Sequence, residues 1–430
     1  MHTQLSIKNK NSKKHTQDFR KHFALNRNAA GFSTATKELI YTLVCHKTEG
    51  PYVYDIDGNE YIDLTMGFGS ILFGHNEKAI RESIEDQLNT SWSVGPISPL
   101  AGQLAEKICQ ITNTERAAFF NSGTEAIMVA LRIAKAATNK NKIVFFKGSY
   151  HGTFDALLTL KNNPITNIAQ EIIPGVTQSI LNESYLLEYG STEALTFIQE
   201  HHEEIAAVLV EPVQSRNPSL QPQAFLKELR AITAANEMAL IFDEVITGFR
   251  IAMGGCQQYF DIEADIVTYG KVIGGGMPIG IVAGKSKYMD TIDGGFWNYE
   301  DESYPQVKST FVAGTFCHHP LAMTASLKVL EILSQSKGEI LHQLNKTTAD
   351  FCVRMNQYFK EKGYKISISY FGSLFRFNTP GKSKLIYYQL LLNGVYIWEG
   401  RNCFFSVAHD DKVIESLEEK IKWSCKQLFD

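Results

Sequence analysis

The sequence predicts an α/β fold with a mostly parallel sheet, and two observations lead to that prediction. Short apolar segments recur along the middle of the chain, at residues 117–120, 143–146, 206–210, 239–242, 265–268 and 280–284. Amphipathic segments with helical periodicity, such as 125–137 and 222–236, separate them. Short apolar strands that alternate with helices are typical of a parallel sheet that is buried on both faces.

The two ends of the chain follow a different pattern. Residues 49–64 predict a β-hairpin, because aromatic and β-branched residues flank an Asp57-Gly58-Asn59 turn. After Pro320 we expect a helix at 321–336, strands at 372–377 and 403–407, and a closing helix at 411–428. This pattern predicts a smaller C-terminal α+β domain.

The predicted domain organisation has four parts. Residues 1–30 are polar and basic, and we interpret them as a solvated arm. Residues 31–75 form an N-terminal segment that packs with the small domain, residues 76–320 form the large domain, and residues 321–430 form the small domain.

The composition is that of an ordinary globular enzyme subunit. The chain of 430 residues has 44% hydrophobic and 20% charged residues, which is enough apolar material for two domains. A net charge of -4 gives no overall attraction to nucleic acid. The seven cysteines are scattered and no two have metal-ligand spacing, so we predict a reduced, cytoplasmic protein without a metal site. No apolar stretch approaches the roughly 18 residues of a membrane span.

Lys271 and Asp243 form the most informative pair of residues. Asp243 closes the apolar run 238–242, and Lys271 follows the next predicted strand in a glycine-rich segment. A pyridoxal 5'-phosphate (PLP) enzyme needs a lysine that holds the cofactor and an acid that keeps the pyridine nitrogen protonated. A structural salt bridge is an alternative for Asp243. A nucleotide-binding P-loop is excluded for Lys271, because its glycines would precede the lysine.

A phosphate site is predicted at residues 121–126, where a strand ends and a helix begins. Free N–H groups and the helix dipole favour an anion there, and Ser122 and Thr124 can add hydroxyl donors. Gly123 allows a close approach of the backbone. An ordinary helix cap is the alternative interpretation.

Other polar residues also follow predicted strands. Tyr150 could stack on one face of the cofactor ring, and Val245 could cover the other. His151 could be a hydrogen-bonding neighbour. An ordinary surface loop is the alternative interpretation of residues 148–152. Glu211 is a candidate polar contact, although a strand-end carboxylate can simply face water. Because a parallel sheet gathers its site at the carboxyl ends of its strands, we expect these residues to lie together.

As a set, the motifs resemble the class III PLP-dependent aminotransferases. The resemblance rests on residues 121–126, Tyr150-His151-Gly152, Glu211-Pro212, 242–250 (FDEVITGFR), 270–280 (GKVIGGGMPIG), Gly314-Thr315-Phe316 and His319-Pro320. These segments span nearly the whole chain in the family's order. The resemblance implies fold type I with a seven-stranded sheet, PLP as cofactor, and a homodimer with shared active sites.

The resemblance also implies a role for each matching residue. Lys271 would bind PLP covalently, and Asp243 would pair with its pyridine nitrogen. Tyr150 and Val245 would cover the two faces of the ring. The phosphate ligands would be Ser122, Gly123, Thr124 and, from the neighbouring subunit, Thr315.

Within this family the chain most resembles the branch of glutamate-1-semialdehyde 2,1-aminomutase, but it differs from that enzyme at two places. It has His318-His319-Pro320 where that enzyme usually has Gly-Asn-Pro, and residues 154–173 lack the glycines of its gating loop. Residues 63–69, 95–102, 296–305 and 396–401 resemble aminotransferase modules of hybrid polyketide–nonribosomal peptide synthetases. That likeness implies a β-keto acyl acceptor, with an acyl carrier protein as a potential partner.

The sequence thus predicts an aminotransferase that moves an amino group from an amino-acid donor to a keto or aldehyde acceptor in a ping-pong reaction. The alternative is an aminomutase that makes 5-aminolevulinate, and a racemase is a weaker choice. Candidate substrate residues are Phe68, Glu211, Glu399 and Arg401, of which Arg401 could bind a carboxylate with its two-pronged guanidinium. A salt bridge is the alternative for Arg401.

Overall fold

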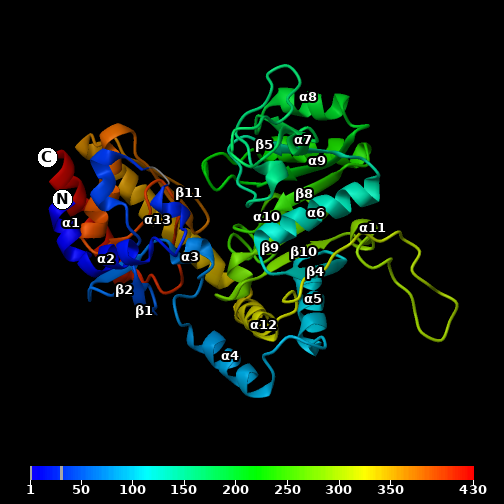
Figure 1. The fold of residues 1–430 in the computed structure, drawn as a ribbon, viewed down its shortest axis with the longest axis horizontal. Coiled ribbons are helices and arrows are strands. Elements are labelled where there is room, and N and C mark those ends of the chain that lie inside the picture. Colours follow the sequence, from blue (N-terminus) through cyan, green and yellow to red (C-terminus); the bar gives the residue numbers. More distant parts are fainter. Residues whose placement is uncertain (1, 30–31) are drawn as a thin grey trace. The chain divides into compact units, whose positions relative to one another are not determined.

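Two compact units make up the chain in the computed structural model, which describes residues 2–29 and 32–430 (Figure 1). Residues 79–345 form one of them, which we call the central unit. Residues 1–78 and 346–430 form the other, which we call the terminal unit. No helix in the described ranges is long and apolar enough to cross a membrane.

A seven-stranded sheet forms the core of the central unit (Figure 1). The strand order is β4-β10-β9-β8-β7-β5-β6, and β10 alone runs antiparallel to its neighbours. The strands are β4 (Arg116–Phe120), β5 (Lys142–Phe146), β6 (Ser184–Leu187), β7 (Ile205–Val210), β8 (Ala239–Asp243), β9 (Ile266–Gly270) and β10 (Gly280–Gly284). The predicted mostly parallel, seven-stranded sheet is therefore confirmed.

Sequence reasoning located six of these strands and missed β6. Strands β7 and β8 are buried along their whole length, as expected for a sheet covered on both faces. Strand β6 is also fully buried, but its apolar run, Tyr185–Leu187, is short and follows a long irregular segment. Its place in the sheet depends on pairing with β5, and the sequence pattern around β6 does not predict that pairing.

Helices cover the sheet of the central unit. They are α4 (Lys78–Thr90), α5 (Pro99–Thr112), α6 (Gly123–Thr138), α7 (Gln178–Leu181), α8 (Thr192–Glu200), α9 (Gln223–Ala235), α10 (Gly255–Phe260), α11 (Ser286–Met289) and α12 (Pro320–Gln335), with 3-10 turns η3 (Asp155–Leu157) and η4 (Lys271–Gly274). Helix α6 packs on β9 and β10 through small buried residues such as Ala126, Ala130 and Ala134. Because these side chains are small, the start of α6 lies close to the sheet.

The terminal unit contains two small sheets. One has the order β1-β2-β3-β13 and the other β11-β12-β14. Their strands are β1 (Cys45–Glu49), β2 (Tyr52–Asp55), β3 (Glu60–Asp63), β11 (Ser367–Phe371), β12 (Leu374–Asn378), β13 (Val395–Tyr396) and β14 (Cys403–Phe404). The predicted hairpin at 49–64 is confirmed as β2 and β3.

The helices of the terminal unit come from both ends of the chain. They are α1 (His2–Lys8), α2 (Lys10–Phe19), α3 (Met66–Gly69), α13 (Glu339–Lys362, which begins in the central unit), α14 (Ile386–Leu392) and α15 (Asp411–Phe429), with 3-10 turns η1 (Asn26–Asn28), η2 (Thr34–Leu39) and η5 (Gly381–Leu385). The long helix α13 and strand β11 were not predicted. The closing helix predicted at 411–428 is α15.

The prediction of a solvated N-terminal arm is wrong. Residues 2–19 form α1 and α2, and the side chains of Leu5, Asn9 and Ser12 are buried. Asn9 donates to the Asp55 carboxylate over 2.9 Å and to the Tyr61 hydroxyl over 2.5 Å. These residues pack through buried hydrogen bonds, so the polar composition of the segment did not indicate that part of it is buried.

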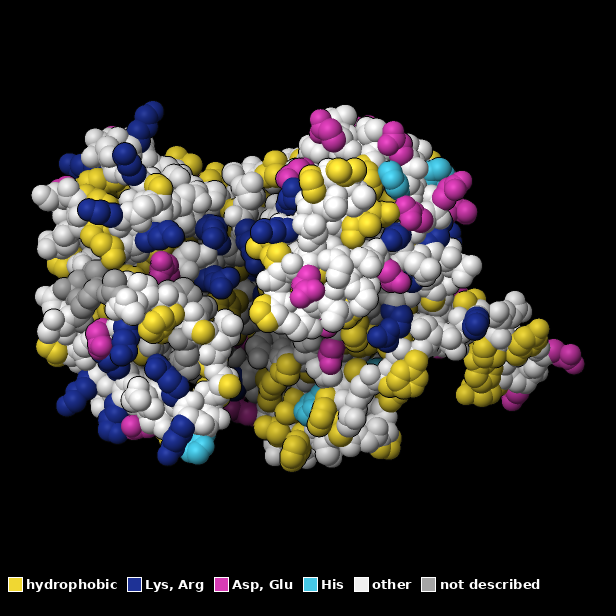
Figure 2. All heavy atoms as spheres, turned by 45° about the horizontal axis from the view of Figure 1, so that its top comes forward, with side chains coloured by type: hydrophobic (Ala, Val, Ile, Leu, Met, Phe, Trp, Pro, Cys, Tyr) yellow, Lys and Arg dark blue, Asp and Glu magenta, His cyan; other side chains and the backbone are white. Residues whose placement is uncertain are grey.

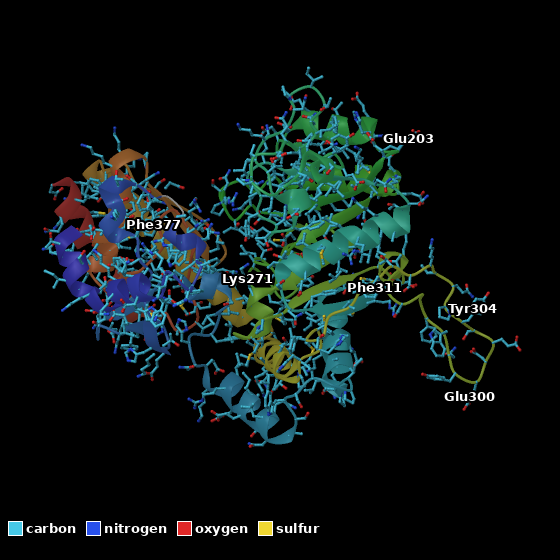
Figure 3. All side chains as sticks on the ribbon, in the orientation of Figure 1. Glu203, Lys271, Glu300, Tyr304, Phe311 and Phe377 are labelled. Carbon is cyan, nitrogen blue, oxygen red and sulfur yellow. The ribbon has the colours of Figure 1, made fainter. Side chains whose placement is uncertain are left out.

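A long loop projects from the central unit between α11 and α12 (Figures 1 and 3). We call residues 294–311 the projecting loop; Glu300 and Tyr304 lie near its end in Figure 3. Backbone bonds from Gln306 and Val307 to Gly294 close its base. Several of its aromatic side chains are exposed, and Figure 2 shows hydrophobic and acidic side chains on this protrusion.

Candidate active site

Five strands of the central sheet point their carboxyl ends toward one edge. Strands β4, β5, β7, β8 and β9 share one direction, since only β10 is reversed. The segments that follow them carry Ser122, Tyr150, Glu211, Asp243 and Lys271. The topology therefore brings these five predicted residues to the same edge of the sheet.

Asp243 ends β8 as a buried carboxylate whose two oxygens have partners. Its Oδ2 lies 2.7 Å from Nδ1 of the buried His151, and its Oδ1 accepts from the backbone N–H of Val245 over 3.1 Å. A carboxylate can only accept, so His151 carries the shared proton on Nδ1. Within the described residues His151 Nε2 is buried without a hydrogen-bond partner. Each oxygen of Asp243 thus has a hydrogen-bond partner, one an imidazole and the other a backbone amide.

Glu211, at the end of β7, is also buried. Its Oε2 accepts from the backbone N–H of Tyr150 over 2.9 Å, and its Oε1 accepts from that of Ser215 over 3.3 Å. Burial raises the pKa of Glu211, while His151 opposes that shift and Asp243 adds to it. The expected polar contact at Glu211 is therefore made inside the protein, where this side chain holds two loops together.

Lys271 directly follows β9 (Figure 3), and its backbone has a left-handed conformation with a φ of 48°. Such a conformation is uncommon for a residue with a side chain. Burial lowers the pKa of Lys271, Asp243 and Glu211 oppose this shift, and Arg250 adds to it. Because its pKa is lowered, Lys271 has a larger neutral, nucleophilic fraction than an exposed lysine.

Val245 packs between two glycines beside these charges. A Cβ atom on Gly123 would lie 2.9 Å from Val245 Cγ1, and one on Gly270 would lie 3.3 Å from the same atom. A side chain at Gly123 would therefore displace Val245. Glu244 anchors the following loop by accepting from the backbone N–H groups of Cys256 and Gln257, at 2.5 and 3.1 Å.

The start of α6 has the form of an anion site. Ser122 is its N-cap, and its hydroxyl accepts from the Glu125 N–H over 3.2 Å. The N–H groups of Gly123 and Thr124 lie in the first turn, where no intrahelical acceptor precedes them. Gly152, at a φ of 82°, lies so close to Thr124 that a Cβ would approach its hydroxyl oxygen to 2.3 Å. The Tyr150 loop therefore closes over the start of this helix.

Tyr150 is exposed over 46% of its surface, and an arginine lies over its ring. The Arg216 guanidinium carbon is 5.5 Å from the ring centroid, which is a cation–π contact. The backbone of Tyr150 is fixed by Glu211, so the exposed ring belongs to the same edge as Asp243 and Lys271.

The other predicted residues come from segments that do not directly follow these strands. Thr315 is exposed in the loop before α12, directly after Gly314, where a Cβ atom would lie 3.9 Å from Asn121 Nδ2. Phe68, Glu399 and Arg401 belong to the terminal unit. There Phe68 meets Trp398 edge-on at 5.1 Å, Glu399 accepts from the Tyr388 hydroxyl over 2.9 Å, and Arg401 is exposed.

Sequence reasoning gave little weight to His151 and none to Arg216. His151 follows Tyr150 in a loop, and only the path of β5 beside β7 and β8 brings it to Asp243. Arg216 stands five residues after Glu211, in a polar turn without a recognisable motif. Both residues are recognised only from a contact between distant segments. Their position after strands β5 and β7 was the one feature of the sequence that indicated a place near the site.

The arrangement fits PLP on structural grounds. A buried acid with a hydrogen-bond partner at each oxygen suits a protonated pyridine nitrogen, and a partly buried lysine with a lowered pKa suits attachment to an aldehyde. Val245 offers an apolar surface and Tyr150 an exposed aromatic ring. The open first turn of α6 suits the phosphate group.

Comparison with known proteins leads to the same family. The sequence pattern described as "Aminotransferase class-III" matches residues 33–409. The glutamate-1-semialdehyde 2,1-aminomutase of Sulfolobus acidocaldarius is 34% identical over 409 residues, covering 90% of this chain and 94% of that protein. The enzyme of that name from Methanosphaera stadtmanae is 35% identical over 400 residues, covering 88% and 91%.

Solved structures share the fold over nearly the full length. A transaminase with PLP bound has a TM-score of 0.86 at 25% identity and covers 98% of both chains. A glutamate-1-semialdehyde aminomutase from Pseudomonas aeruginosa has a TM-score of 0.83 at 18% identity, covering 100% of this chain and 97% of that chain, so it shows the fold alone. Because the family pattern and these relatives match most of the chain, the chain belongs to the class III aminotransferases, a PLP-dependent family of fold type I.

Proposed function

We propose that this protein is an aminotransferase that moves an amino group from an amino-acid donor to a keto or aldehyde acceptor. The observation that carries the proposal is the position of Lys271, which is partly buried at the carboxyl edge of the sheet, where the buried Asp243 and Glu211 act on it electrostatically. When bound, PLP supplies an electrophilic aldehyde and an electron-withdrawing ring that acidifies the donor's α-carbon. The residues of the chain must then hold the ring and move protons.

Lys271 Nζ is the group that can move the proton. Its lowered pKa leaves part of the amine neutral, so it can accept a proton from carbon and return it to a neighbouring carbon. Asp243, which is hydrogen-bonded to His151, is the carboxyl group that would pair with a protonated ring nitrogen. Glu211 fixes the Tyr150 backbone, which orients the aromatic ring at the mouth of the site.

The segment at residues 154–173 favours intermolecular transfer over the aminomutase reaction. It contains no glycine, and it is hydrogen-bonded to its neighbours: Asn162 donates to the Leu186 carbonyl over 2.8 Å, and the Ala169 N–H donates to the Ser184 carbonyl over 2.8 Å. Such a segment is poorly suited to act as the mobile gate that the aminomutase resemblance implies. An aminomutase acting on glutamate-1-semialdehyde is the second candidate, since relatives of that name are 34–35% identical.

Glutamate semialdehyde distinguishes the two reactions. We expect the purified protein, loaded with PLP, to form no 5-aminolevulinate from the semialdehyde alone. We expect it to convert keto acceptors only when an amino donor is present. A panel of amino-acid donors against free and carrier-bound β-keto acyl acceptors, read through the cofactor spectrum, identifies the substrate pair. Donor-independent formation of 5-aminolevulinate at a steady rate would contradict the aminotransferase proposal.

We propose His151 as a positioning residue that acts through Asp243. Replacing it with leucine removes the 2.7 Å hydrogen bond and leaves a buried carboxylate with less support, so PLP should bind roughly 10- to 100-fold more weakly. A His151→Asn variant keeps an N–H donor and should recover part of this affinity. The dissociation constant for PLP, measured from the cofactor absorbance after dialysis, checks the prediction. If His151→Leu binds PLP as tightly as the wild type, His151 is not a positioning residue for Asp243.

We also propose a homodimer in which Thr315 reaches the phosphate of the partner's cofactor. Thr315 is exposed, and the nearby projecting loop leaves aromatic side chains in water, with exposures of 85% for Phe296, 83% for Tyr299 and 80% for Phe311. Exposed apolar surface of this kind is typical of an interface. A second copy of the chain is the occupant that supports a shared site.

The test is the mass of the protein in solution. The wild type should sediment as a dimer, and a Phe296→Ser/Tyr299→Ser double variant should weaken dimerisation by at least about tenfold, because each buried aromatic stabilises an interface by roughly 1.5–3 kcal/mol. Ile165→Ser is the control, since Ile165 is equally exposed, at 88%, outside the projecting loop. A monomeric wild type, or a double variant with unchanged dimerisation, would contradict the proposed interface.

A further inference from the structure

Arg216 is a cation that the predicted site does not use. It is exposed, and its guanidinium carbon lies 5.5 Å from the centroid of the Tyr150 ring. Across residues 2–29 and 32–430, no carboxylate pairs with Arg216 at ion-pair distance. The nearby Lys147 is different, because Glu188 neutralises it at 2.5 Å. Arg216 is therefore an exposed positive charge beside Tyr150 that no carboxylate of the described residues neutralises.

The loop that carries Arg216 is fixed on both sides of this residue. Before it, the Ser215 N–H donates to Glu211, and the Gln214 amide donates to the Lys147 carbonyl over 2.7 Å and to the Ser149 hydroxyl over 2.9 Å. After it, the Asn217 N–H donates to the Gln214 carbonyl over 2.8 Å. These bonds tie the loop to the segment that holds Tyr150, so the backbone on both sides of Arg216 is held in place before any ligand binds.

Glu211 links the loop that carries Arg216 to Tyr150 and Lys271. This carboxylate accepts from both the Tyr150 and the Ser215 N–H groups, and it also acts electrostatically on Lys271. One buried side chain thus binds the backbone of Tyr150 and that of Ser215, the residue before Arg216. An arginine stacked on an aromatic ring keeps its N–H edge free for a planar anion.

We propose that Arg216 is a specificity-determining residue that binds the carboxylate of the amino donor and of the corresponding keto acid. The inference rests on the proposed aminotransferase function and assigns the residue that would distinguish its amino-acid donor from a simple amine. A guanidinium matches a carboxylate with two parallel N–H···O bonds, which distinguishes it from a lysine at the same place. Its stacking on Tyr150 places that binding surface at the ring expected to cover the cofactor.

The test compares a donor with and without its carboxylate. L-Alanine and isopropylamine differ by a carboxylate in place of a methyl group, and the rate of each donor half-reaction is read from the cofactor spectrum. In Arg216→Gln we expect kcat/KM for L-alanine, or for L-glutamate if it reacts faster, to fall roughly 10- to 100-fold. The rate with isopropylamine should stay within about threefold, and Arg216→Lys should recover part of the loss.

A binding measurement keeps this inference separate from the proposed function. Propionate and succinate, which cannot react, should shift the cofactor absorbance of the wild type, and Arg216→Gln should bind them at least about tenfold more weakly. Arg81→Gln is the matched control, because it removes another exposed cation of the central unit, one that pairs with Glu85. The dissociation constant for PLP should be unchanged in both variants.

The outcomes decide between the two proposals. If the wild type transaminates and Arg216→Gln loses neither carboxylate binding nor discrimination, the inference about Arg216 fails and the proposed function remains. If no donor reacts but carboxylate binding is lost in Arg216→Gln, the function fails and the site remains. An equal loss with L-alanine and isopropylamine would mean that Arg216 only shapes the loop, which would also overturn the inference.

Discussion

The site depends on the burial of opposite charges at the carboxyl edge of one sheet. Asp243 and Glu211 are buried and Lys271 is partly buried, in surroundings where an uncompensated charge would be strongly unfavourable. His151 and backbone amides stabilise the two carboxylates, which in turn support the ammonium form of Lys271 against desolvation. The same balance that makes these charges tolerable leaves Lys271 more reactive than a lysine in water.

The surrounding backbone makes this arrangement rigid. Lys271 has a left-handed conformation, Gly123 approaches Val245 too closely for a side chain, and Glu244 ties the loop after Asp243 to the start of α10. Small residues of α6 let the predicted phosphate site lie against the same edge. Positions and charges are therefore set before a ligand arrives, which favours binding and catalysis by reducing reorganisation.

The sequence was sufficient for the parts of the structure that have a local signature. Buried strands such as β7 and β8 are apolar along their length, and the residues that follow them, Glu211 and Asp243, could be assigned to one edge from the parallel order alone. It was insufficient where partners come from distant segments. The helices α1 and α2 pack through Asn9 and Asp55, His151 meets Asp243, and Arg216 covers Tyr150, all through contacts without sequence periodicity.

The central claim is that Lys271 is the residue that binds the cofactor covalently, and borohydride reduction followed by peptide mapping tests it most directly. The account predicts a single pyridoxyl label on Lys271 of the PLP-loaded protein, and none on a Lys271→Ala variant that remains folded by circular dichroism. A label on another lysine of the wild type, or a reducible cofactor band that persists in Lys271→Ala, would contradict it.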